Sequence, residues 1–291
     1  MKTFNHTFTN NLELIEFIKN NSLENKEVFI QVFSWIIDKS LLENIIKTLN
    51  ENISKPIINW VTTAWELIDG KSFQNSIVIS FSCFEKTNIN SIYYKIEENK
   101  ESFDETLKNI IKDNTKLVLF FADWFKKSSK IEYFLKRFYE LYPHIMIWWG
   151  RAWDNLEFKT SYIFNNDLVV DNWIIITSFS SDDLIVNNWH NFDWIPIWKE
   201  FNITKAKDNI IYEIDNTNII EIYKKYFWEE IAKELPWIWL EFPLIINRDG
   251  TNIARWAMQK VENWGLLLTW NIFNWEKVKL WFWNKWNILN G

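Results

Sequence analysis

Five polar side chains in two short motifs could bind a small charged ligand. Thr62, Thr63 and Glu66 lie in the stretch NWVTTAWEL, and Arg151 and Asp154 lie in the stretch IWWGRAWD. Hydroxyls and backbone N–H groups at a turn can bind a carboxylate, and a glutamate can bind an amino group. A planar guanidinium binds a carboxylate through two hydrogen bonds. These residue types therefore predict a site for a small anion or zwitterion.

A purely structural interpretation of the same residues stays open. Threonine side chains commonly satisfy the backbone of their own turn. The arginine and the aspartate of the second motif are three residues apart and could form a surface ion pair worth about 0–1 kcal/mol. Only the fold can decide whether the two motifs meet.

The other reactive residue types do not form a catalytic or metal-binding pattern. His6, His144 and His190 are far apart in the sequence and none belongs to a pair with metal-ligand spacing. Cys83 lies in an apolar alternation and is predicted to be a core residue rather than a nucleophile. We therefore predict no catalytic residue, no metal and no cofactor.

Tryptophan and glycine have exchanged their usual abundances. The chain has 21 Trp and 5 Gly in 291 residues, whereas glycine is normally about 7% of a protein. Asn-Gly and Asp-Gly mark tight turns because type I′ turns need a positive φ at both central residues. Tryptophan takes the place of glycine in seven such pairs: Asn59-Trp60, Asn172-Trp173, Asn188-Trp189, Asn263-Trp264, Asn274-Trp275, Asp123-Trp124 and Asp193-Trp194. We interpret most of the tryptophans as standing at glycine positions, as they would if the codon UGA had been read as tryptophan instead of glycine.

Charge and hydropathy exclude two classes of partner. The formal net charge is −6, so no basic surface is expected to bind nucleic acid. The first residues are polar, and no run of about 18 apolar residues could span a membrane. We expect a cytoplasmic protein with no membrane insertion.

Hydrophobic periodicity predicts an α+β fold of mixed or antiparallel sheets with packed helices. Helices are expected at Leu12–Asn20, Asp38–Asn50, Ser102–Lys112, Ser129–Leu141 and Asn218–Leu235. Strands are expected at Lys26–Ser34, Pro56–Asn59, Phe73–Phe84, Ile92–Ile96, Lys116–Ala122, His144–Ile147, Tyr162–Phe164, Leu168–Val170, Ile174–Phe179, Phe201–Ala206, Ile210–Ile214, Glu241–Asn247, Ile253–Gln259, Gly265–Leu268 and Val278–Phe282. Phe201–Ala206 and Ile210–Ile214 are expected to form a hairpin.

Two equal intervals indicate an internally duplicated N-terminal unit. Trp35 and Trp124 are 89 residues apart, and so are Trp60 and Trp149. We predict an N-terminal arm with a short helix over 1–26, two repeats over 27–115 and 116–186, and a further region over 187–291. Because the chain stops just after a predicted strand, we expect that last region to be incomplete.

The motifs resemble the FIST domain when glycine is read at the tryptophan positions. They become NGVTTAGEL and IGGGRAGD, and FNITKAKDNIIYEID follows in the C-terminal region. The resemblance extends from about Glu27 to the end of the chain. It implies a small-ligand-binding sensory module of signal transduction, with an amino acid as a candidate ligand, no catalytic activity and a separate signalling protein as the output partner.

Two other function classes stay open at this point. A carbohydrate-binding protein would need genuine tryptophans gathered on one exposed face. An enzyme would need a cleft between the repeats that contains Cys83 or the carboxylates of Glu66 and Asp154.

Overall fold

The computed structural model describes residues 1–64, 66–68, 70–95, 100–123, 128–154, 160–166, 169–170, 173–187, 194–233, 242–248 and 251–283. The chain divides into two compact units, Met1–Asn188 and Trp189–Gly291. Both contain helices packed on mixed or antiparallel sheets, so the predicted α+β class is confirmed. No helix among the described residues is long and apolar enough to cross a membrane.

A six-stranded mixed sheet forms the first half of the first unit, in the order β1-β6-β2-β3-β10-β11. Its strands are β1 (Lys2–Thr7), β2 (Glu27–Ser34), β3 (Lys55–Thr62), β6 (Ile77–Cys83), β10 (Ile163–Phe164) and β11 (Val169–Val170). β2 and β3 are parallel, and Ser34 lies opposite Thr62 at their carboxyl ends. The crossover between them is α2 (Lys39–Asn52), which begins where the side chain of Asp38 accepts a hydrogen bond from the N–H of Leu41 at 3.1 Å.

A four-stranded sheet forms the second half, in the order β7-β12-β8-β9. Its strands are β7 (Asn88–Lys95), β8 (Thr115–Ala122), β9 (Met146–Arg151) and β12 (Trp173–Ser180). β8 and β9 are parallel, with Ala122 opposite Arg151, and α4 (Ser128–Leu141) is their crossover. The helix α3 (Lys100–Ile110) packs on the same face as α4, where the rings of Tyr94, Phe103 and Phe134 contact one another.

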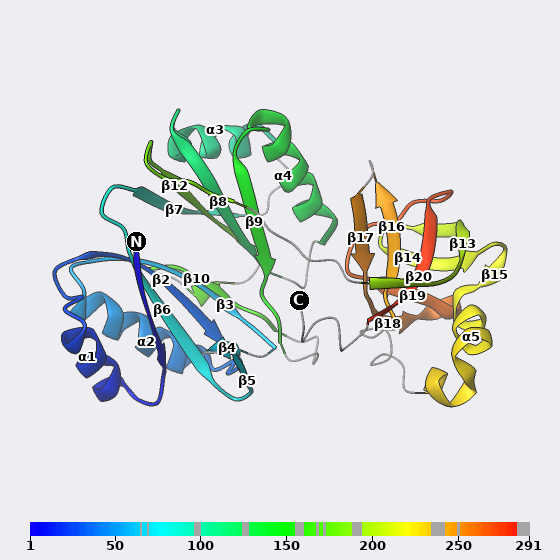
Figure 1. Ribbon diagram of the computed structural model, residues 1–291, viewed down its shortest axis with the longest axis horizontal. Helices are drawn as coiled ribbons and strands as arrows, with labels where there is room; N and C mark the ends of the chain where they lie inside the picture. The colour runs from blue at the N-terminus through cyan, green and yellow to red at the C-terminus, as the bar shows by residue number, and fades with distance from the viewer. Residues whose placement is uncertain are drawn as a thin grey trace. The chain divides into compact units, whose positions relative to one another are not determined.

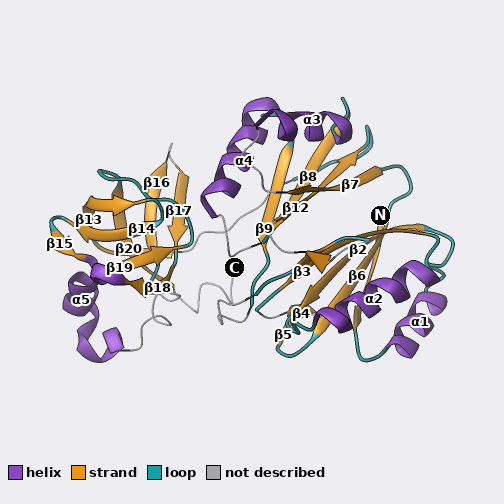
Figure 2. Cartoon of the chain, turned by 180° about the vertical axis from the view of Figure 1, so that it is seen from behind, coloured by secondary structure: helices purple, strands orange, loops and turns teal. Residues whose placement is uncertain are grey.

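The two sheets pack face to face, with helices on their outer faces (Figures 1 and 2). The helix α1 (Asn11–Asn20) and α2 cover the six-stranded sheet through one apolar core. Between the sheets, the rings of Phe29 and Phe179 meet edge to face with centroids 5.1 Å apart. The buried amide of Asn59 bonds to Thr177 and accepts from Ser91 across the same interface. The first unit therefore has four layers: helices, sheet, sheet and helices.

The two parallel pairs have the same β-α-β topology. The helix α2 begins at Lys39 and α4 begins at Ser128, which is the 89-residue interval seen in the tryptophans. Trp124, which defines one of those intervals, lies outside the described residues. A shared topology is what a duplication would produce, and the duplication itself stays a prediction.

Two local predictions for the first unit are wrong. The polar N-terminal arm contains β1, which pairs with β6 along its whole length because an edge strand needs only one apolar face. The single strand predicted over Phe73–Phe84 is divided by a turn in which Asn75 has φ 54°. Before that turn, β4 (Glu66–Ile68) and β5 (Lys71–Phe73) form a small hairpin of their own.

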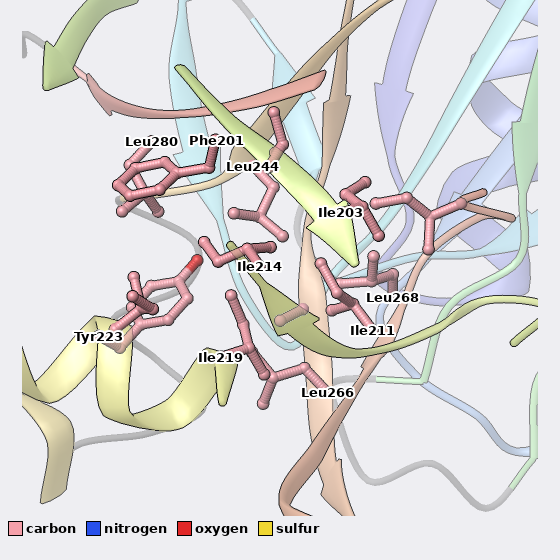
Figure 3. Close-up of a cluster of buried hydrophobic side chains, with 14 of the residues drawn as sticks. Phe201, Ile203, Ile211, Ile214, Ile219, Tyr223, Leu244, Leu266, Leu268 and Leu280 are labelled. Atoms are coloured by element: carbon pink, nitrogen blue, oxygen red, sulfur yellow. The ribbon is translucent and has the colours of Figure 1, made fainter. Parts of the chain in front are cut away.

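The second unit is built on an eight-stranded antiparallel sheet, in the order β17-β16-β20-β13-β14-β19-β18, with β15 paired to β14. Its elements are β13 (Trp194–Lys207), β14 (Ile210–Ile214), β15 (Thr217–Asn218), α5 (Ile219–Lys233), β16 (Leu244–Arg248), β17 (Thr251–Arg255), β18 (Ala257–Val261), β19 (Gly265–Leu268) and β20 (Lys277–Trp283). The predicted hairpin between the first two is confirmed. Figure 3 shows its core, in which Tyr223 of α5 lies against isoleucine and leucine side chains of the strands.

The described tryptophans fall into two conformational groups. Trp264 and Trp275 have φ values of 59° and 71°, and Asn263 before the first has φ 59°. That pair of positive angles is the type I′ geometry that Asn-Gly normally supplies. Trp60, in contrast, lies inside β3, so the turn expected at Asn59-Trp60 is wrong. Trp149 lies inside β9. The codon interpretation stays a prediction, and it is supported most directly at the two positive-φ positions.

Candidate functional site

The carboxyl ends of β3, β8 and β9 bring the second motif next to the first. Thr62 is the last residue of β3 and Arg151 is the last residue of β9. The N–H of Trp153 donates to the carbonyl oxygen of Thr62 at 2.7 Å, which ties the segment after β9 to the end of β3. Parallel strands in α/β units present their carboxyl ends at a common edge, where ligands are commonly bound. The two motifs therefore meet at Thr62 through a backbone contact.

Arg151 lies among carboxylates in a poorly solvated position. Its Nε and Nη1 atoms are shielded from solvent. Burial lowers the pKa of Arg151 to about 10, and the negative charges of Glu132 and Asp123 oppose that effect. The guanidinium is therefore a buried cation rather than one half of a surface ion pair.

Asp123 and Ser161 belong to this neighbourhood and were not among the predicted site residues. Asp123 follows β8 directly and is 3% exposed. Its Oδ1 accepts a hydrogen bond from Ser161 Oγ at 2.5 Å. The sequence carried one signal for Asp123, because an aspartate that ends an apolar strand occupies the position where site residues of α/β units cluster.

Thr62 and Asp154 use their side chains to hold the backbone of one segment. Thr62 Oγ1 accepts from the N–H of Tyr162 at 3.1 Å, and Asp154 Oδ2 accepts from the N–H of Thr160 at 3.1 Å. Both side chains are buried. These contacts are structural, but they fix the chain around residues 160–162 rather than the turn that follows β3.

Thr63 and Glu66 form a separate cluster with Ser76. Thr63 Oγ1 donates to Glu66 Oε1 at 2.5 Å, and Ser76 Oγ donates to Glu66 Oε2 at 2.5 Å. The N–H of Trp35 donates to the carbonyl oxygen of Ser76 at 3.0 Å, which ties the end of β2 to this cluster. The cluster lies beside a cavity of about 230 Å³ that is lined by Phe33, Thr63, Glu66, Leu67 and Val78. Neither Arg151 nor Asp154 is among these lining residues.

The carboxyl of Glu66 is expected to make stability depend on pH. Burial raises the pKa of Glu66 above its ordinary value of 4.5, while hydrogen bonds from Ser76 and Thr63 oppose part of the rise. Between the unfolded and the folded pKa, the folded chain binds more protons, so the free energy of unfolding falls as the pH rises. We expect Glu66→Gln to gain stability relative to the parent chain as the pH rises above about 4.5. Urea unfolding at several pH values measures this difference.

The control for that experiment is Glu16→Gln, which changes an exposed glutamate of α1. It gives the pH profile for replacing an exposed glutamate, against which the Glu66→Gln profile is compared. A Glu66→Gln profile parallel to the parent profile would contradict the buried-carboxyl assignment.

The remaining sequence candidates do not join either cluster. Cys83 is a half-buried free thiol at the end of β6, packed against the apolar core of the first sheet. Among the described residues, no group of three or more His, Cys, Asp and Glu side chains could hold a metal ion. The exposed tryptophans include Trp148 and Trp149 in the first unit and Trp264 and Trp275 in the second.

Comparison with known proteins identifies the family. The FIST N domain model matches residues 28–217, about two thirds of the chain. A search of curated proteins returned no match. The matched range includes both parallel β-α-β units, both site motifs and the hairpin that begins the second unit. The chain therefore belongs to the FIST family, whose domains are sensory modules of signal transduction.

Proposed function

We propose that this chain is a non-catalytic sensory module that binds an amino acid and passes the signal to a separate output protein. The observation that carries the proposal is the composition of the cavity beside Glu66. Its lining combines one carboxyl and one hydroxyl with the apolar side chains of Phe33, Leu67 and Val78. Such a cavity suits a ligand with an amino group at one end and a small apolar side chain at the other.

The volume of the cavity beside Glu66 is consistent with a ligand as small as an amino acid. The cavity of about 230 Å³ lies just below the usual 300–1,000 Å³ range of small-molecule sites, so a drug-sized ligand would be too large. Glu66 is already held by Thr63 and Ser76. A carboxylate has about four acceptor positions, so an ammonium group would share Glu66 with these hydroxyls or displace one of them.

The second cluster has a positioning role in this proposal, because Arg151 does not line the cavity. The Arg151 cation, with the charges of Asp123 and Glu132, would hold the end of β9 in place. Thr62 and Asp154 would fix the backbone around residues 160–162. The proposal thus keeps all five predicted residues while separating ligand contacts from positioning contacts.

A thermal-shift screen of the standard amino acids against the full chain tests the proposal. A specific ligand stabilises the folded state by RT ln(1 + [L]/Kd), which is about 2.7 kcal/mol at a hundredfold excess over Kd. We expect at least one amino acid to raise Tm. Thr63→Val and Glu66→Gln should abolish that shift, because the first removes a hydroxyl and the second a carboxyl group from the cavity lining.

Thr217→Val is the matched control, because Thr217 is an exposed threonine of β15 in the other unit. It should leave the ligand-induced shift unchanged. The absence of a shift with every amino acid would overturn the ligand assignment. An equal shift in the parent chain and in both cavity variants would place the ligand elsewhere.

A further inference from the structure

A second and larger cavity lies between the two sheets of the first unit. Its volume is about 640 Å³, which is within the usual 300–1,000 Å³ range of small-molecule sites. One wall is the inner face of β2, where Phe29, Gln31 and Phe33 alternate with residues that face the helices. None of its lining residues is Thr63, Glu66 or Arg151, so it is distinct from the proposed amino acid site.

The opposite wall is apolar as well. Leu117, Leu119 and Phe121 occupy the inner face of β8, and Phe179 of β12 closes the space between the sheets. The rim includes Trp148 and Ile185, which are 52% and 83% exposed, so the cavity opens to solvent. Five phenylalanines, at 29, 33, 84, 121 and 179, still line the cavity if Trp148 and Trp149 are read as glycine.

Charge determines the class of ligand. None of the side chains that line this cavity is an aspartate, glutamate, lysine or arginine, and the α-amino group of Met1 belongs to a residue that is 81% exposed. Burying an ion without a partner is costly, so a charged ligand is disfavoured. Phenylalanine rings favour other aromatic rings in edge-to-face or offset contacts. Of the polar lining residues Gln31, Ser82 and Asn187, Ser82 is bonded to Thr3, and the Gln31 amide on the inner face of β2 can donate to or accept from one polar atom.

We propose that this cavity binds a neutral aromatic molecule of about two fused rings with one hydrogen-bonding group, directed at Gln31. The inference goes beyond the amino acid site, because the two cavities share only Phe33 among their lining residues and the ligand chemistry is different. The first unit would then have a second ligand site, and a ligand bound there would change how the two sheets pack against each other.

Fluorescence titration of the full chain with N-phenyl-1-naphthylamine, a neutral aromatic probe, tests the cavity. We expect saturable binding of one probe per chain. Leu117→Trp adds an indole to the cavity wall and should weaken probe binding about tenfold or more. Leu12→Trp makes the same change at a 79% exposed position of α1 and should bind the probe as the parent chain does. Equal affinity in the two variants, or no saturable binding, would overturn the proposal.

Two further measurements separate folding from binding and test the role of Gln31. Circular dichroism confirms that Leu117→Trp is folded, and its amino acid thermal shift should match that of the parent chain. In displacement of the probe, 1-naphthol should outcompete 1-methylnaphthalene several-fold, and Gln31→Leu should remove that preference. Displacement by a long-chain fatty acid without displacement by either naphthalene would overturn the aromatic assignment. Failure of the amino acid screen would leave these results unaffected.

Discussion

Replacing Asp123 with alanine is expected to lower the free energy of unfolding by about 3 kcal/mol. Asp123 is almost fully buried, accepts a hydrogen bond from Ser161, and is one of two negative charges that act on Arg151. Removing one partner of a buried charge pair typically costs about 3–5 kcal/mol, because the other charge stays buried. We expect the lower end of that range, since Glu132 remains close to the guanidinium. Urea unfolding followed by circular dichroism measures the change.

Two further variants accompany this measurement. The first separates the charge of Asp123 from its hydrogen bond, and the second is an exposed control. Asp123→Asn keeps an oxygen for Ser161 and removes the charge, so it should lose less stability than the alanine variant. Glu51→Ala removes one partner of the exposed Lys47–Glu51 pair and should change stability by no more than about 0.5 kcal/mol. A loss below about 1 kcal/mol in Asp123→Ala would show that Asp123 does not stabilise the buried cation.

Replacing Trp275 with glycine is expected to stabilise the chain by about 1 kcal/mol. A residue with a side chain pays about 1–2 kcal/mol to adopt a left-handed conformation, and part of this gain is lost because glycine is more flexible when unfolded. Trp275 is 76% exposed, so little packing is sacrificed. Trp264→Gly should gain less, because Lys224 and Lys260 lie 5.6 and 5.8 Å from its ring centroid. Each exposed cation–π contact is worth about 0.5–1 kcal/mol.

Trp281→Gly is the contrasting control. Trp281 is 9% exposed in β20 and packs with Ile245 and Ala254. Its replacement should cost about 3–5 kcal/mol, the range for truncating a large buried side chain. Calorimetric Tm values of the three variants therefore distinguish a glycine-like turn position from a packed tryptophan. Destabilisation by Trp275→Gly would remove the main structural support for the glycine interpretation.

The places of the two motifs could be predicted in part, because each lies at the end of a strand with a strong apolar pattern. Thr62 ends β3 and Arg151 ends β9, so each could be expected at the carboxyl end of its own sheet. Their chemical roles could not be predicted in the same way. The hydroxyl oxygen of Thr62 accepts a hydrogen bond from the N–H of Tyr162, a residue 100 positions later in the chain. Local spacing carries no information about such a contact.

The environments of Glu66 and Asp123 also depended on distant segments. Glu66 is held by Ser76 beyond the β4–β5 hairpin, and Asp123 is held by Ser161 beyond the end of β9. Burial sets the pKa direction of Glu66, and burial is a property of the packed fold rather than of residue order. The sequence therefore indicated polar candidates but not which of them share a cavity.

Taken by itself, the sequence determined the α+β class, the five long helices, the hairpin of the second unit and the family resemblance, because these depend on local periodicity and on short motifs. It also identified the tryptophans in Asn-Trp and Asp-Trp pairs as candidates for glycine positions. Only the tertiary structure decided that Trp60 and Trp149 belong to strands while Trp264 and Trp275 occupy positive-φ turns. It likewise decided that the motifs form two polar clusters and that an apolar cavity separates part of the two sheets. The physical reason is that backbone pairing and burial are set by contacts between segments far apart in the chain, whereas periodicity and turn chemistry are set within a few residues.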